Sequence, residues 1–121
     1  MIILKRAYDR DLDTESYSIL VDRLWPRGLS KADLRPDEWL KDIAPSDQLR
    51  KSFGHDPARW ADFRKNYLLE LKGKADLLQK IKHLEREKGE VTLLYAARDT
   101  EHNNAVVIRE ALGKSPVGNR Q

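Results

Sequence analysis

Side chains able to bind an anion and to carry a proton are concentrated in residues 98–104. This segment contains Arg98, Asp99, His102, Asn103 and Asn104. An arginine presents a planar fork of donors to a phosphate or carboxylate, and a histidine exchanges protons near neutral pH. The segment follows an apolar run, residues 91–97, that predicts a buried strand, and a helical pattern follows it. Because loop side chains and helix N-terminal amides converge at such junctions, we expect an anionic ligand to bind here.

A second polar segment directly follows another predicted strand, Tyr17–Asp22. It contains Asp22, Arg23, Trp25 and Arg27. If this strand lies parallel to the strand at 91–97, both polar segments open on the same edge of the sheet. The two sets of side chains would then share one cleft.

Each candidate residue has an expected role in that cleft. We expect Arg23, Arg27 and Arg98 to bind the anion. We expect His102 to carry the proton, oriented by Asp99 or Asp22. Further contacts to the ligand are expected from Asn103 and Asn104, through hydrogen bonds, and from Trp25 and His55. The chemistry predicted is binding of a phosphate-bearing or other anionic small molecule, with or without catalysis. The alternatives are a nucleic-acid-binding or regulatory module and a partner-binding scaffold with no catalytic role.

Structural explanations of the same residues remain open. Asp99 or Thr100 could cap the last helix while Arg98 pairs with a distant carboxylate and His102 lies on the surface. Asp22 and Arg23 could form a buried ion pair beside a rigid Trp25–Pro26 turn. His55 lies in the segment Phe53–Pro57, whose plainest meaning is a helix stop followed by a helix start.

The common enzyme signatures are missing from this chain. It has no phosphate-binding glycine loop, no serine nucleophile elbow and no H-E-x-x-H motif. No two of the three histidines are closer than 19 positions, and there is no cysteine, so the spacing predicts no metal site and no cofactor. Thiolate catalysis and disulfides are excluded, which favours a cytoplasmic setting.

The elements that must position these residues form one α/β domain. The predicted strands are Ile2–Tyr8, Tyr17–Asp22, Asp37–Ile43 and Val91–Ala97; the first two are expected to pair as a long-looped hairpin, and the third is nearly as compatible with a helix. The predicted helices are a turn capped by Ser30, a helix from Ser46 to Gly54, one from Asp56 to Gly73, one over Ala75–Lys88, and one with Ala105, Val106, Ile108 and Leu112 facing inward.

This alternation predicts a small mixed or partly parallel sheet flanked by about four helices. Residues 1–113 are expected to form the single domain, and residues 114–121 a flexible tail.

Charge and hydropathy set few limits on partners. The 121 residues include 23 Lys or Arg and 20 Asp or Glu, a net charge of +3 with the signs interspersed. This balance permits nucleic-acid binding without indicating it. No apolar run reaches the roughly 20 residues that cross a bilayer, so no membrane association is expected. The sequence does not define the oligomeric state.

Several blocks of the sequence resemble one known family. These are Leu20–Ser30, Trp39–Ser46, Phe53–Pro57 with Trp60, and Leu94–Asp99 with Glu101–Ala105. They are similar to the YeaO-like family of small bacterial proteins of unknown function. The resemblance implies an α/β fold and a cytoplasmic bacterial protein. It implies no activity, substrate or cofactor. Members of the wider superfamily carry cysteines at positions that match Tyr95 and Asn103, so any thiol chemistry of those relatives does not carry over to this chain.

Overall fold

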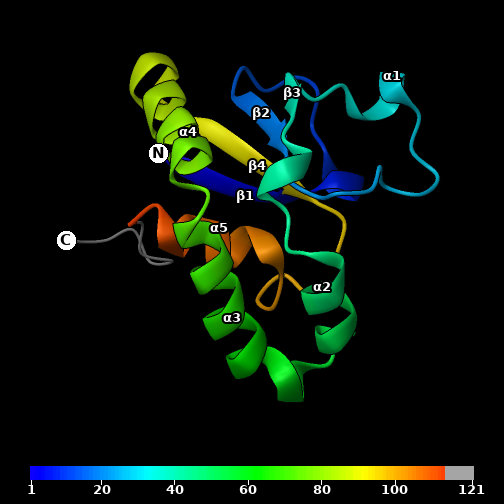
Figure 1. Ribbon diagram of the computed structural model, residues 1–121. Helices are drawn as coiled ribbons and strands as arrows, with labels where there is room; N and C mark the ends of the chain where they lie inside the picture. The colour runs from blue at the N-terminus through cyan, green and yellow to red at the C-terminus, as the bar shows by residue number, and fades with distance from the viewer. Residues whose placement is uncertain (114–121) are drawn as a thin grey trace.

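The computed structural model describes residues 1–113 and is built on a four-stranded sheet (Figure 1). Its strands are β1 (Ile2–Arg6), β2 (Tyr17–Leu20), β3 (Glu38–Trp39) and β4 (Val91–Tyr95), in the spatial order β1-β4-β2-β3. All neighbouring pairs are parallel. The predicted α/β class is confirmed, and the sheet is wholly parallel.

The predicted hairpin of the first two strands is wrong. β4 lies between them, with Ile2 and Tyr17 both in register with Val91. Every residue of β4 is buried, so this apolar strand needs partners at both edges and cover on both faces. β1 and β2 provide the two edges, which places them parallel instead of antiparallel.

The helices begin and end close to the predicted residues. They are α1 (Lys31–Leu34), α2 (Asp47–Phe53), α3 (Trp60–Lys72), α4 (Ala75–Lys88) and α5 (Asn104–Ala111), with 3-10 turns at Ala7–Asp9, Lys41–Ile43 and Pro57–Arg59. Ser30, Ser46 and Asp56 each accept a hydrogen bond from a backbone N–H in the first turn that follows. None of these helices is long and apolar enough to cross a membrane within the described residues.

Two local predictions need correction. The segment Asp37–Ile43 is neither one strand nor one helix, because pairing with β2 ends at Trp39 and a 3-10 turn follows. In α5, Val107 is fully buried while Val106 is only half-buried, because α5 packs against α3 as well as β4. The predicted tail, residues 114–121, lies outside the described residues.

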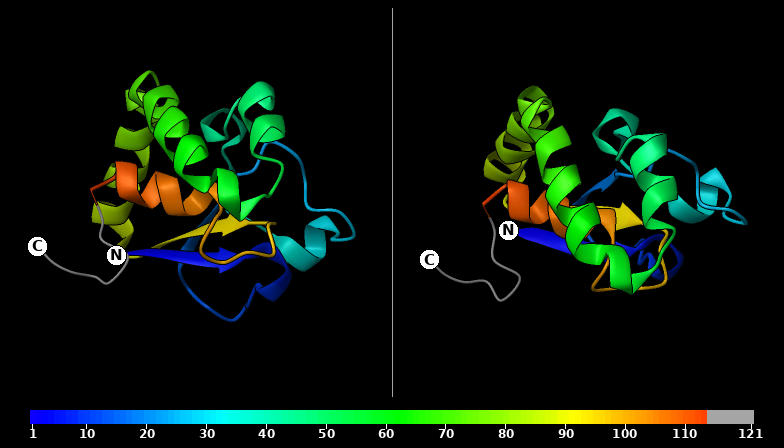
Figure 2. Two further views of the ribbon diagram at one scale, coloured as in Figure 1. Left: turned by 90° about the horizontal axis from the view of Figure 1, so that it is seen from below. Right: turned by 60° about the horizontal axis from the view of Figure 1, so that its bottom comes forward.

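The two faces of the sheet are covered unequally. Helices α2 to α5 lie on one face, as the views in Figure 2 show, and they enclose the larger core with Ile19, Leu93 and Tyr67 at its centre. The other face carries a small cluster of Leu20, Leu94 and Leu34. Trp25 and Trp39 pack edge to face beside that cluster, with ring centroids 5.4 Å apart. The loop that contains Trp25 is therefore fixed to the sheet.

Candidate functional site

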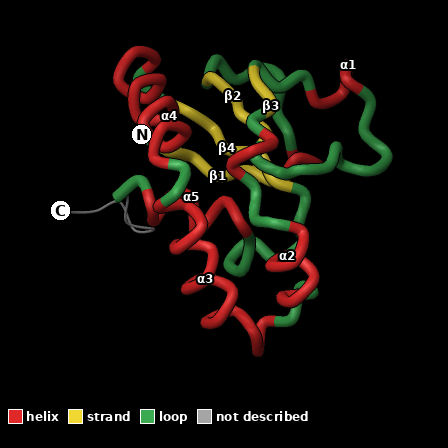
Figure 3. The backbone as a smooth tube through the Cα atoms, in the orientation of Figure 1, coloured by secondary structure: helices red, strands yellow, loops and turns green. Residues whose placement is uncertain are grey.

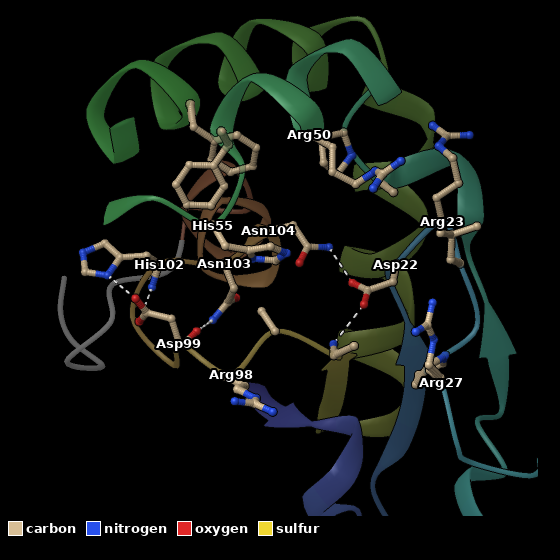
Figure 4. A pocket seen from close by; sticks show the side chains of 18 of the residues that line it. Asp22, Arg23, Arg27, Arg50, His55, Arg98, Asp99, His102, Asn103 and Asn104 are labelled. Atoms are coloured by element: carbon tan, nitrogen blue, oxygen red, sulfur yellow. Dashed lines mark hydrogen bonds and ion pairs between the residues drawn. The ribbon is translucent and has the colours of Figure 1, made fainter. Parts of the chain in front are cut away.

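A cleft of about 630 Å³ lies at the carboxyl ends of β2 and β4. Loops leave the sheet at this edge, as the tube in Figure 3 shows. The cleft is lined by all ten residues that the sequence nominated, namely Asp22, Arg23, Trp25, Arg27, His55, Arg98, Asp99, His102, Asn103 and Asn104. Figure 4 labels all of them except Trp25.

The parallel pairing of β2 with β4 explains why the two polar segments meet. Leu20 is in register with Leu94, and the Val21 N–H donates to the Leu94 carbonyl at 3.1 Å. The strands therefore end at the same level, and the chain enters the cleft at Asp22 from one strand and at Ala96 from the other. This is the edge at which open parallel sheets bind their ligands.

Asp22 is bound from two sides at the floor of the cleft. Its carboxylate accepts hydrogen bonds from the Ala96 N–H at 2.9 Å and from Asn104 Nδ2 at 3.0 Å, while the same Nδ2 also donates to the Val21 carbonyl. Burial raises the pKa of Asp22, although these hydrogen bonds and the charge of His55 act in the opposite direction. A carboxylate in this position disfavours additional negative charge close to it.

Asp99, and not Asp22, is placed to orient His102. The Asp99 carboxylate lies 2.8 Å from His102 Nδ1 and also accepts from the backbone N–H groups of Glu101 and His102. The hydrogen bond from the Glu101 N–H, followed by that from the His102 ring, lowers the pKa of Asp99. The rings of Trp60 and His102 pack edge to face, with their centroids 5.1 Å apart. The ring therefore has a fixed orientation on the wall of the cleft.

Four arginines from three segments surround the cleft: Arg23, Arg27, Arg50 and Arg98. Arg50 forms an ion pair with Asp47 at 3.3 Å, whereas Arg23 Nε lies 4.0 Å from the same carboxylate, beyond hydrogen-bonding distance. That Nε is buried and has no hydrogen-bond partner among the described residues. The guanidinium groups of Arg27 and Arg98 make no hydrogen bond or ion pair within residues 1–113.

Some of the structural explanations are confirmed and others are wrong. Trp25 is packed in a fixed turn, and Phe53–Pro57 does join the end of one helix to the start of the next helical turn. Asp22 pairs with Ala96 and Asn104 instead of Arg23, and Arg98 has no carboxylate partner in the described part of the chain. The cap of α5 is Asn103, whose side chain accepts from the Val106 N–H and donates to the Asp99 carbonyl. The sequence had predicted Asp99 or Thr100 as this cap, because Asp and Thr are also common capping residues.

Sequence reasoning missed part of the lining. Arg50 is the missed cation, and Tyr8, Leu24, Pro45, Phe53 and Phe63 are among the missed apolar residues. The helix that carries Arg50 was predicted correctly, but no local pattern indicates which of its faces turns toward the sheet edge. Phe53 lies in the block Phe53–Pro57, which resembles the YeaO-like family. That resemblance was the only indication in the sequence that Phe53 lies near the site.

No group of three or more His, Asp or Glu side chains within residues 1–113 is arranged to hold a metal ion. The positions at which the wider superfamily has cysteines are packed into the structure here. Tyr95 is buried at the end of β4, and Asn103 is the buried cap of α5. Neither residue has a thiol, and of the two only Asn103 lines the cleft.

The fold and the site together define a small α/β protein with one parallel sheet and a polar cleft at the carboxyl ends of its strands. The chain belongs to the DUF488 family, since the family model described as "Inactive DUF488-N3 subclade" matches residues 1–117. Within it, the chain is YeaO-like. It is 46% identical over 110 residues to the uncharacterised protein YeaO of Escherichia coli (strain K12), covering 89% of this chain and 93% of that protein.

Mycobacterial proteins are also similar. The uncharacterised protein Rv3073c of Mycobacterium tuberculosis and the uncharacterised protein Mb3100c of Mycobacterium bovis are each 37% identical over 108 residues, covering 88% of this chain and 89% of theirs. No solved structure matches the chain. The resemblance to a family of unknown function is thus confirmed, and what the cleft does has to be inferred from its chemistry.

Proposed function

We propose that the protein binds a phosphate-bearing or other anionic small molecule in the cleft. The observation that carries the proposal is the charge of the lining. Four arginines and two carboxylates give an excess of two positive charges when the histidines are neutral. Both carboxylates already accept hydrogen bonds from neighbouring groups, whereas the guanidinium groups of Arg27 and Arg98 have no hydrogen-bond or ion-pair partner within residues 1–113. An anion would supply the acceptors that these guanidinium groups lack.

Binding without turnover is the form of the proposal that we favour. The matching family model is described as an inactive subclade, and the chain has no cysteine to act as a nucleophile. We place this binding protein in the cytoplasm, in keeping with the absence of cysteine.

The Asp99–His102 pair supports an enzyme as a second candidate. A carboxylate that fixes Nδ1 leaves Nε2 of the imidazole to exchange a proton with a ligand. Turnover of a phosphate ester that is lost in His102→Ala and kept in Arg86→Ala would favour this candidate over simple binding.

Thermal unfolding with added anions tests the proposed function. We expect inorganic phosphate, sulfate, sugar phosphates or nucleoside monophosphates to raise the midpoint, because a ligand at 100 times its Kd stabilises the folded state by about 2.7 kcal/mol. Arg98→Ala should weaken binding roughly tenfold or more, since a hydrogen-bonded ion pair contributes about 1.5–3 kcal/mol. Arg86→Ala is the matched control, because Arg86 is exposed on α4 and does not line the cleft.

Two results would count against an anion site. A midpoint that no anion raises would remove the proposal, and so would equal losses in Arg98→Ala and Arg86→Ala. Binding to duplex DNA that weakens steeply with added salt, and that is insensitive to Arg98, would favour the nucleic-acid alternative instead.

A further inference from the structure

We infer that the anion is attached to an apolar, ring-sized body that the cleft also receives, as in an aryl phosphate. This inference rests on the proposed function and narrows it to one class of ligand. Three observations carry it: the size of the cleft, the exposed apolar side chains that line it, and the planar arginines beside them.

The cleft is too large for a simple anion. A water molecule takes about 30 Å³ in the liquid, and an inorganic phosphate needs only a few times that volume. The cleft has about 630 Å³, which lies within the roughly 300–1,000 Å³ of sites that enclose whole organic molecules. A phosphate bound to the arginines would leave most of this space to the rest of its molecule.

The lining exposes apolar surface next to the cations. Leu24 is 65% exposed and lies between Arg23 and Trp25, and Tyr8 is 43% exposed. The Tyr8 hydroxyl donates to the Arg27 carbonyl at 2.7 Å, so its ring is held beside that arginine. A ligand body that covers Leu24 and the Tyr8 ring would remove this apolar surface from water.

The arginines suit both parts of such a ligand. A guanidinium group binds an anion through the N–H groups at its edge and stacks against a flat ring with its face. Figure 4 shows Arg23 and Arg27 to the right of Asp22 and Arg50 above it, whereas Arg98 lies to the left, on the side of His55 and His102. Asp22 disfavours negative charge at the centre of the cleft. The anionic group of the ligand should therefore lie among the arginines, and the apolar part of the ligand should fill the remaining space.

A single exposed leucine is ordinary on a protein surface, and what distinguishes Leu24 is its position in the lining of the cleft. The chain offers a matched comparison in Leu69 on α3, which is 55% exposed and does not line the cleft. Replacing either leucine with serine changes an exposed side chain, so neither variant is expected to unfold.

Calorimetric titration with three probes tests the inference: inorganic phosphate, glycerol phosphate and phenyl phosphate. The two esters carry the same anionic group on a polar and on an apolar body. We expect phenyl phosphate to bind about tenfold more tightly than glycerol phosphate, since covering roughly 60 Å² of apolar surface gives that factor. Leu24→Ser should reduce this preference several-fold, whereas Leu69→Ser should keep it.

The possible failures are distinguishable. Equal affinity for the two esters, or a preference that Leu24→Ser leaves unchanged, would overturn the inference and leave the anion site intact. If none of the three probes binds, the proposed function fails and the inference fails with it.

Discussion

At the scale of single residues, His55 has the least ordinary backbone of the cleft. Its φ is 58°, and the only other non-glycine residue with a positive φ among residues 1–113 is Arg35 at 39°. A left-handed conformation costs a residue with a Cβ roughly 1–2 kcal/mol. Arg35 ends α1, where such geometry terminates a helix, while His55 lines the cleft. The structure therefore holds this histidine in place at a cost in stability.

Replacing each of these residues by glycine separates stability from binding. We expect His55→Gly and Arg35→Gly both to leave the free energy of urea unfolding unchanged or to raise it by up to about 1 kcal/mol, because glycine adopts positive φ without strain. Only His55→Gly should weaken anion binding, by several-fold. Identical affinities in the two variants would show that His55 makes no contact with the ligand.

Asp22 should make anion binding depend on pH. Its pKa is raised by burial, so on acidification it takes up a proton earlier than an ordinary aspartate and stops repelling the ligand. We expect the affinity for sulfate, which stays ionised, to rise as the pH falls toward this pKa. Asp22→Asn should bind sulfate more tightly at neutral pH and show a smaller rise. The difference between the two titrations isolates the contribution of Asp22, and superimposable profiles would exclude it.

The raised pKa of Asp22 also makes the stability of the folded state depend on pH. The contribution of the neutral carboxyl is fully present below the pKa of the unfolded chain and is lost as the pH rises through the raised pKa of the folded state. In Asp22→Asn the corresponding loss should disappear from the dependence of unfolding free energy on pH.

At the scale of elements, Asn103 joins the loop from β4 to the helix α5. Its side chain is buried, caps α5 at the Val106 N–H and donates to the Asp99 carbonyl. Asn103→Ala should destabilise the fold by about 1–2 kcal/mol in urea unfolding, as the loss of a cap does. It should also weaken anion binding, because Asn104 would no longer be held against Asp22.

Ser30→Ala is the control for that experiment. Ser30 caps α1 in a capping box with Asp33, away from the cleft. Its loss should lower stability without changing anion affinity. If Asn103→Ala also leaves affinity unchanged, the start of α5 does not position the ligand site.

The sequence predicted local elements well because their causes are local. Ser46 marked the start of α2, and Asp56-Pro57 marked the start of the 3-10 turn that leads into α3 at Trp60. Gly54 and Gly89 directly follow the ends of α2 and α4. Strand pairing was predicted poorly, since it depends on partners far along the chain. Nothing near Tyr17 indicates that β4, more than seventy residues later, is inserted beside it. The prediction of a single strand or helix over Asp37–Ile43 was wrong for the same reason, because pairing with β2 determines that β3 ends at Trp39.

At the scale of the whole molecule, the sequence predicted many of the residues that line the cleft, but it did not predict the complete lining. Two strand ends rich in polar residues meet in any parallel sheet in which the strands are neighbours. Arg50, by contrast, depends on how α3 holds the segment before α2. Tyr67 donates to the Ile43 carbonyl, Lys74 to the Ala44 carbonyl, and Glu70 accepts from Ser46. Contacts of side chains with a distant backbone leave no pattern in the sequence, so the orientation of α2 could not be foreseen.

The central position of β4 also determines when the cleft can exist during synthesis. β4 is the last strand of residues 1–113, yet β1 and β2 each pair with it over more residues than with any other strand. The edges of β1 and β2 that β4 occupies therefore stay unpaired during synthesis until almost the whole domain has been made. Their docking onto β4 completes the sheet and brings Asp22 to Ala96 and Asn104 in the same step. A chain that stops before β4 lacks the strand that joins β1 to β2, and it also lacks the Ala96 and Asn104 donors to Asp22.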